Sequence, residues 1–159
     1  MQTLLHDLFV ELERNRARVE SSLARLSEET IWRRPRPSMN SVGNLCLHLA
    51  GNESHYIGEV VGGVPSGRRR SEEFLAEGGA TRDEHIAKLA AARAITHDVF
   101  AALGPEDLDR ELESNHPPEP TVRRVILHVT EHYGYHTGQM VLLARLFQAG
   151  DGRILEWGH

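Results

Sequence analysis

Residues 121–148, TVRRVILHVTEHYGYHTGQMVLLARLFQ, are the stretch that decides the fold. Apolar residues recur in it every three or four positions, which is the period of an α-helix with one buried face. Thr121 can cap its start, and Gly150 lies past its end as a stop signal. The buried face is expected to run along Val122, Val125, Val129, His132, His136, Met140, Leu143 and Phe147.

Three earlier segments show the same helical period. The first covers about 3–26. The second is capped by Ser41 and ends at Gly62. The third opens at Thr81, which stands three residues before a glutamate as in a capping box, and ends at Gly104. Four helices are therefore predicted.

The connections after the second and third helices are long. A polar stretch of about 20 residues leads to Gly79, and a proline-containing stretch leads to Thr121. No segment shows the period-two alternation of a strand, so the predicted fold is all-α, a four-helix bundle that is not simply up-down-up-down. The length predicts a single domain over 1–159, with the tail 150–159 and its Trp157 packing back on the bundle.

Composition excludes several function classes. The net charge is -5, with 23 acidic and 18 basic residues, so a nucleic-acid-binding surface is not expected. No apolar stretch approaches the roughly 20 residues that cross a bilayer, and the N-terminus lacks the pattern of a signal peptide. Cys46 is the only cysteine, so no internal disulfide can form. A cytoplasmic protein with no membrane partner is expected, and Cys46 is expected to be a small buried residue.

The ten histidines are the compositional feature that points to a function. A chain this rich in histidine contains a pair at the spacing of His132 and His136 by chance about as often as not, so the pair alone says little. Its position says more, because both residues occupy the expected buried face, where an unpaired imidazole nitrogen is costly. Two imidazoles one helical turn apart can also direct nitrogens at the same metal ion.

His48 is the expected third ligand. It falls one turn after Leu45 on the buried side of the second helix. Three neutral imidazoles and a water molecule form an open site that suits zinc, nickel or another divalent ion. The alternative is three buried histidines that bond to carbonyl groups or to one another. Asn52 and His128 are candidates to orient the ligands or a substrate, although His128 could equally be a residue at the edge of the site.

Charged residues in the second connection have two interpretations. Glu73 and the run Arg68, Arg69 and Arg70 could line or cover the pocket, but solvated loop charges are the favoured interpretation. His55 lies seven residues after His48 and is expected to be a surface histidine. The arrangement of a zincin protease is absent, because Tyr133 stands where the His-Glu-x-x-His motif requires glutamate.

Four segments together carry a family resemblance: 40–52 (NSVGNLCLHLAGN), 62–68 (GGVPSGR), Glu73-Phe74 and 132–139 (HYGYHTGQ). With them the chain resembles the DinB-like superfamily, small damage-inducible helical-bundle proteins, over about 1–148. The resemblance implies an up-down-down-up bundle, often dimeric, with a three-histidine metal site formed by His48, His132 and His136. Related members include S-transferases that use bacillithiol or mycothiol and a mycothiol-dependent isomerase.

The expected function is therefore that of a divalent-metal-dependent enzyme. It would be a thiol S-transferase or a hydrolase that acts on a small molecule through a metal-activated thiol or water, with a low-molecular-weight thiol as possible co-substrate. A homodimer is expected from the resemblance. The alternative is a non-catalytic, dimer-forming stress-response protein in which the ion is a structural staple. A structural ion is normally held by four protein ligands, whereas the sequence offers three and indicates no general base.

Overall fold

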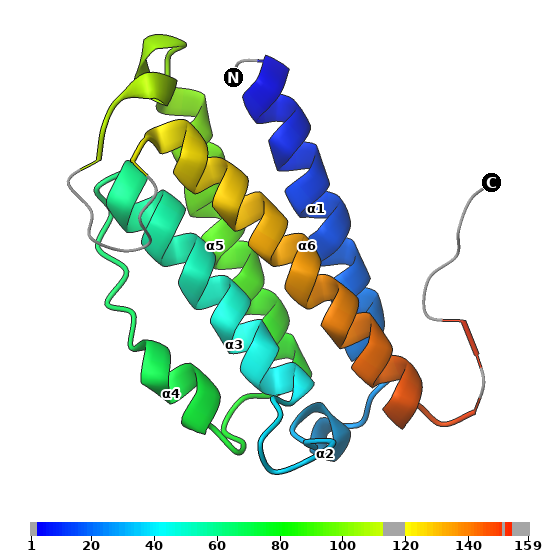
Figure 1. The fold of residues 1–159 in the computed structure, drawn as a ribbon. Helices are drawn as coiled ribbons and strands as arrows, with labels where there is room; N and C mark the ends of the chain where they lie inside the picture. The colour runs from blue at the N-terminus through cyan, green and yellow to red at the C-terminus, as the bar shows by residue number, and fades with distance from the viewer. Residues whose placement is uncertain (1–2, 113–119, 151, 154–159) are drawn as a thin grey trace.

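The structure is a computed structural model that describes residues 3–112, 120–150 and 152–153. Its long helices are α1 (Thr3–Leu23), α3 (Val42–Glu53), α5 (Arg82–Ala102) and α6 (Val122–Phe147), shown in Figure 1. Three short helices connect them, namely α2 (Glu28–Ile31), α4 (Arg70–Leu75) and the 3-10 helix η2 (Glu106–Asp109). The described residues contain no strand, only one isolated β-bridge between Glu111 and Thr121. The predicted all-α four-helix bundle is confirmed.

The four long helices run in two directions. In Figure 1, α1 and α6 descend from the end that holds the N-terminus, whereas α3 and α5 ascend. This is the up-down-down-up order that the resemblance implied. Helix α6 packs against α1 and α3, and α5 packs against α3. The two segments that carry the predicted ligands, α3 and α6, are therefore neighbours although they are far apart in the sequence.

Three of the four long helices begin with the predicted side-chain cap. The Ser41 hydroxyl accepts a hydrogen bond from the backbone N–H of Asn44, and the Asn44 side chain accepts one from the backbone N–H of Ser41. Thr81 and Glu84 form the predicted capping box. Thr121 accepts from the backbone of Arg124. These bonds satisfy N–H groups that have no partner inside the helix, which is why the starts could be predicted.

The second predicted helix changes its winding halfway. After Glu53 the chain continues as the π-helix η1 (Ser54–Val61), in which the Gly62 N–H donates to the Ile57 carbonyl at 3.0 Å. The helix still ends at Gly62, as predicted. A Cβ atom at Gly62 would lie 2.4 Å from the side chain of Val99, so only glycine permits this close approach to α5.

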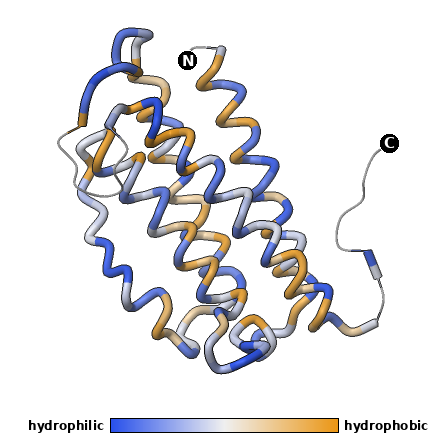
Figure 2. The backbone as a smooth tube through the Cα atoms, viewed as in Figure 1, coloured by the Kyte–Doolittle hydropathy of each residue, from blue (hydrophilic) through white to orange (hydrophobic). Residues whose placement is uncertain are grey.

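The core is formed by apolar side chains from all four long helices, and Figure 2 shows hydrophobic and hydrophilic positions along each of them. On α6 the predicted buried face is wrong in its middle. Tyr133 and Thr137 are buried there, whereas His132 and His136 are half-buried at the edge that faces α3. The predicted face followed a 3.5-residue repeat, and a straight helix of 3.6 residues per turn drifts away from it. The buried residues of α6 are Val122, Val125, Ile126, Val129, Tyr133, Thr137, Met140, Leu143 and Ala144.

One charged network lies inside the bundle. The Glu53 carboxylate is fully buried and accepts hydrogen bonds from Arg93 at 2.7 and 3.1 Å and from the Thr96 hydroxyl at 2.7 Å. Arg93 also donates to Glu13 at 2.7 Å, and its guanidinium lies 5.1 Å from the ring centre of Tyr133. The network therefore joins α1, α3 and α5, and it contacts α6.

The predicted packing of Trp157 lies outside the described residues. Of the tail, the structure describes 150, 152 and 153, where Arg25 donates a hydrogen bond to the carbonyl of Arg153 at 3.0 Å. In the described parts of the chain, no helix has the length and apolar character that a membrane span requires.

Candidate metal centre

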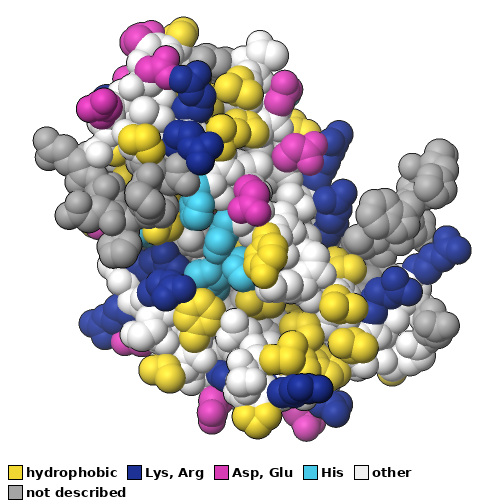
Figure 3. All heavy atoms as spheres, viewed as in Figure 1, with side chains coloured by type: hydrophobic (Ala, Val, Ile, Leu, Met, Phe, Trp, Pro, Cys, Tyr) yellow, Lys and Arg dark blue, Asp and Glu magenta, His cyan; other side chains and the backbone are white. Residues whose placement is uncertain are grey.

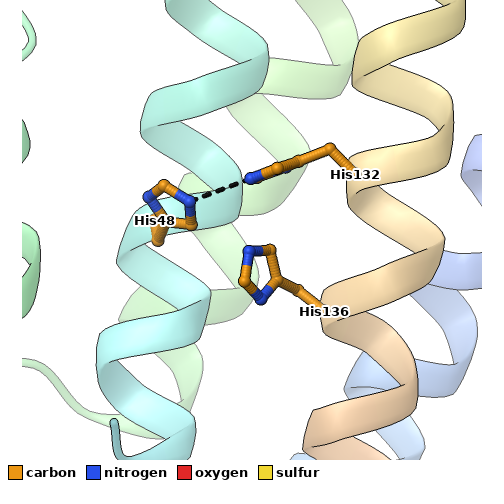
Figure 4. Close-up of side chains that lie close together, drawn as sticks. All are labelled: His48, His132 and His136. Carbon is orange, nitrogen blue, oxygen red and sulfur yellow. Dashed lines mark hydrogen bonds between the residues drawn. The ribbon is translucent and has the colours of Figure 1, made fainter.

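Three histidines from two helices converge on one point. His48 of α3 and His132 and His136 of α6 each offer a ligand atom, and these atoms all lie within 4.8 Å of one another. The Nε2 atoms of His48 and His132 are 3.0 Å apart. Figure 4 shows the three rings facing one another across the gap between the helices. The structure thus brings together all three residues that the sequence indicated.

The donor set fits a single divalent ion. Two imidazole nitrogens at about 2.0–2.1 Å from one ion lie roughly 3–4 Å apart, and the Nε2 atoms of His48 and His132 are 3.0 Å apart. Imidazole suits zinc, nickel, copper and iron. The two Nε2 atoms form a hydrogen bond with each other in this structure, and a divalent ion bound to both rings would take the place of the proton between them. The geometry is compatible with a metal ion.

Glu73 orients the ring of His48. Its Oε2 accepts a hydrogen bond from His48 Nδ1 at 2.8 Å, which leaves the Nε2 lone pair directed at the centre. Arg68 donates to both oxygens of the same carboxylate, at 2.6 and 3.0 Å. The side chains of Glu73 and Arg68 are only 9% and 8% exposed. The favoured interpretation of solvated loop charges is therefore wrong for these two residues, because α4 docks on the bundle; it holds for Arg69, whose side chain is 76% exposed.

One face of α3 holds α4 in this position. Asn44, His48 and Gly51 are spaced by four and three residues, so they share a helix face. The Asn44 amide donates to the carbonyls of Glu73 at 2.9 Å and Ala76 at 2.7 Å. A Cβ atom at Gly51 would lie 2.3 Å from Glu73 Oε1, so the glycine leaves room for the carboxylate. The same face thus supplies a ligand and places the group that orients it.

Gln139 has the corresponding position beside His136. Its Oε1 accepts a hydrogen bond from His136 Nδ1 at 2.8 Å, so the Nε2 of this ring is also free for an ion. The spacing of three residues on one helix could have indicated this contact from the sequence. No comparable spacing connects Glu73 with His48, because 25 residues and a change of chain direction separate them.

The two predicted orienting residues have different surroundings. Asn52 is buried one turn after His48, and its Oδ1 has no hydrogen-bond partner within the described ranges. His128 stacks on His132 with ring centres 5.7 Å apart and also contacts the ring of Tyr56 at 5.5 Å. His128 therefore lies directly beside a ligand, whereas Asn52 has no bond to the three histidines.

The electrostatics keep His132 and His136 in the neutral form that can bind a metal ion. Burial and the neighbouring histidines lower the pKa of His132 to about 3, and burial also lowers the pKa of His136. Both rings are neutral near pH 7 and need lose no proton to bind a metal. Burial raises the pKa of Glu73, but hydrogen bonds from His48 and Arg68 outweigh it, so the carboxyl is ionised.

Other groups near the centre take no part in it. Cys46 is buried and burial raises the pKa of its thiol, which makes it inert as a nucleophile, as predicted. His55 is half-buried and bonds to Glu59 at 3.2 Å. A separate cleft of about 480 Å³ lies between α3, α5 and the second connection; Arg69 and Lys88 line it, and Glu73 and Arg68 separate it from the histidines.

Comparison with known proteins agrees with the fold. The chain resembles the crystal structure of a conserved protein from Enterococcus faecalis, with a TM-score of 0.79 over 92% of this chain and 98% of the other. The two sequences are 20% identical, so this likeness shows the fold alone. No curated protein matches the sequence. Residues 11–140, which include His48, His132 and His136, match the DinB superfamily. The chain belongs to the DinB superfamily.

Proposed function

We propose that the chain is a divalent-metal-dependent enzyme in which His48, His132 and His136 hold one ion, zinc or nickel, that activates a small-molecule thiol or water. One observation carries the proposal. Three imidazoles converge where two of them are still half-exposed, and no fourth histidine, cysteine or carboxylate joins the group in the described residues. A site with three protein ligands and access to solvent is typical of catalytic rather than structural metal ions.

The ion would supply a lowered pKa for a bound thiol or water, which provides a nucleophile at neutral pH. The residues of the chain do the positioning. Glu73 and Gln139 each accept a hydrogen bond from the Nδ1 of a ligand and so fix its tautomer. In thiol transfer, the thiol releases its proton to solvent and its sulfur bonds to an electrophilic carbon. The leaving group departs with the electrons of the broken bond. Some members of the superfamily use thiols as substrates, which is why we propose thiol transfer rather than hydrolysis.

Metal analysis tests the site itself. Wild type, His48→Ala and His132→Ala are loaded with zinc or nickel, desalted and measured by mass spectrometry of the metal. We expect one ion per wild-type chain and little in either variant. His97→Ala is the matched control, because the side chain of His97 is 57% exposed and lies away from the centre. Equal metal content in all four proteins would remove the proposed site.

A second measurement separates an enzyme from a protein with a structural ion. Each metal-loaded protein is mixed with a low-molecular-weight thiol and an electrophilic dye, and conjugation is followed over time. An enzyme accelerates conjugation in wild type but not in His132→Ala. A structural ion would raise the unfolding temperature and leave the conjugation rate at the uncatalysed level.

A further inference from the structure

We infer that Arg70 binds a negatively charged group of the molecule that reaches the metal centre, so that the site selects small anionic substrates. The inference rests on the proposed function, because it concerns what the proposed metal centre binds. Three observations support it. Arg70 lies close to His48, the neighbouring arginines form ion pairs with carboxylates, and the Arg70 guanidinium forms none with a described residue.

Arg70 is connected to His48 through one aromatic ring. Its guanidinium lies 5.2 Å from the ring centre of Phe74, and the Phe74 ring lies 4.7 Å from that of His48. A cation over an aromatic face is attracted to it, which restricts the guanidinium to this side of the centre. One aromatic ring therefore separates the Arg70 guanidinium from the ring of His48.

The charge of Arg70 also acts on a second series of rings, which ends at His132. Burial raises the pKa of Tyr56, and the charges of Arg68 and Arg70 oppose that rise. The Tyr56 ring contacts His128, and His128 stacks on His132. Arg70 thus contacts the series of rings that ends at His48, and its charge acts on the series that ends at His132.

The three consecutive arginines have three different environments. Arg68 is buried and bonded to both oxygens of Glu73. Arg69 forms an exposed ion pair with Glu72 at 3.1 Å and lines the separate cleft. Arg70 is exposed and has no hydrogen bond or ion pair with any described residue. Its guanidinium can therefore bind a carboxylate or similar anion through two parallel hydrogen bonds.

The other charges around the centre do not cancel Arg70. Glu73 is matched by Arg68, and Glu59 is bonded to Ser66 and His55. Glu131 is the exposed carboxylate whose charge acts on His136. The two carboxylates without a cationic partner, Glu59 and Glu131, are outweighed by Arg70 together with the proposed divalent ion, so the local field attracts anions. Figure 3 shows the histidines open to solvent as a strip with Lys or Arg side chains next to it.

The test uses thiols of equal length and different charge. Cobalt replaces the native ion, because a thiolate bound to cobalt has a strong absorption band that can be titrated. The probes are 3-mercaptopropionate, 2-mercaptoethanol and cysteamine, which carry a negative, a neutral and a positive group on the same two-carbon spacer. For each protein we take the ratio of its affinity for 3-mercaptopropionate to its affinity for 2-mercaptoethanol. We expect this ratio to be roughly fivefold higher in wild type than in Arg70→Ala.

Charge variants and a neighbouring arginine provide the controls. Arg70→Lys should keep part of the preference and Arg70→Glu should shift it toward cysteamine, whereas Arg69→Ala should leave it at the wild-type value. The intrinsic differences among the three thiols cancel, because the ratio of affinities in one protein is compared with the same ratio in another.

The outcomes distinguish the two proposals. If thiols bind but the preference is the same in wild type and Arg70→Ala, Arg70 does not select the substrate and the inference is overturned, while thiol activation stands. If cobalt is bound and none of the thiols produces the band, thiol activation is rejected, and the role of Arg70 is rejected with it.

Discussion

At the scale of single residues, Glu73 and Gly51 determine how the ring of His48 is held in the candidate metal site. Glu73 fixes the tautomer of the ring, and Gly51 leaves the space in which the Glu73 carboxylate lies. Neither residue was assigned this role from the sequence. Both roles depend on where α4 docks, which no local periodicity encodes.

Glu73→Gln should lower metal affinity by about 10- to 100-fold, the usual effect of removing a group that supports a ligand. Glutamine keeps the shape of the side chain but loses its negative charge. That charge makes the Nε2 of His48 a stronger electron-pair donor to a metal ion. Competition with a chromophoric chelator measures the affinity. Glu72→Gln is the control, since this neighbour is 65% exposed and should change nothing. Equal affinities in both variants would mean that Glu73 only holds α4.

Gly51→Ala should weaken metal binding without removing any polar group. The new methyl would lie 2.3 Å from Glu73 Oε1, so the carboxylate has to move away from His48. We expect an affinity loss of about tenfold, within the range for a disturbed supporting group. Gly138→Ala on α6 is the matched control, because nothing lies within 4 Å of its Cβ position. That variant should bind metal normally and gain up to about 1 kcal/mol in stability.

At the scale of the elements, His85 determines how α5 responds to acid. His85 lies in the first turns of α5, fully buried against Trp32 with ring centres 5.3 Å apart. Neither of its nitrogens has a hydrogen-bond partner in the described structure, and burial lowers its pKa. Unfolding therefore lets this ring take up a proton more easily. Its stabilising contribution is complete above its ordinary pKa of about 6.5 and is lost as the pH falls.

His85→Leu should remove that sensitivity. We expect the stability of the variant, relative to wild type, to improve as the pH is lowered from 7.5 to 5, because leucine has no proton to bind. Urea unfolding at each pH gives the two free energies. If the free energy of unfolding changes with pH in the same way in wild type and in His85→Leu, the protonation of His85 does not change on unfolding. His132 and His136 titrate in both proteins, so their contributions cancel in the difference.

The long helices could be predicted because their signals are local. Ser41, Thr81 and Thr121 cap the helices that they were expected to cap, and Gly62 ends the second helix. Helix α4 has six residues and is held by Asn44 and Arg34 rather than by its own sequence. The π-helical winding of η1 likewise depends on packing, as the close approach of Gly62 to Val99 indicates.

At the scale of the whole molecule, the buried Glu53–Arg93 pair connects α3 with α5, and the bond of Arg93 to Glu13 adds α1. Arg93→Met should lower the free energy of unfolding by about 3–5 kcal/mol, because it leaves the Glu53 carboxylate buried without its partner. The double variant Arg93→Met with Glu53→Leu should be more stable than this single variant, since it removes both charges. Urea unfolding measures both. A double variant less stable than the single one would indicate that the pair is itself strongly stabilising.

The convergence of the three histidines could be predicted because each position requires only the phase of one helix, whereas the rest of the candidate site required the assembled bundle. His132 and His136 were placed on the buried face of α6, and the true phase puts Tyr133 there and turns the histidines toward α3. The predicted phase of the helix was wrong by part of a turn. His132 and His136 still lie side by side, because residues four apart in a helix share one face. The contact of Glu73 with His48 arises only when the second connection folds against α3.

If the proposed site binds an ion, the bond between Glu73 and His48 couples the docking of α4 to the binding of that ion. Whatever strengthens one must strengthen the other by the same factor. The rate at which a protease cuts after Arg69 or Arg70 would then report whether the metal site is occupied, although the protease does not contact the ion. Adding zinc or nickel should slow that cut, and a chelator should restore it.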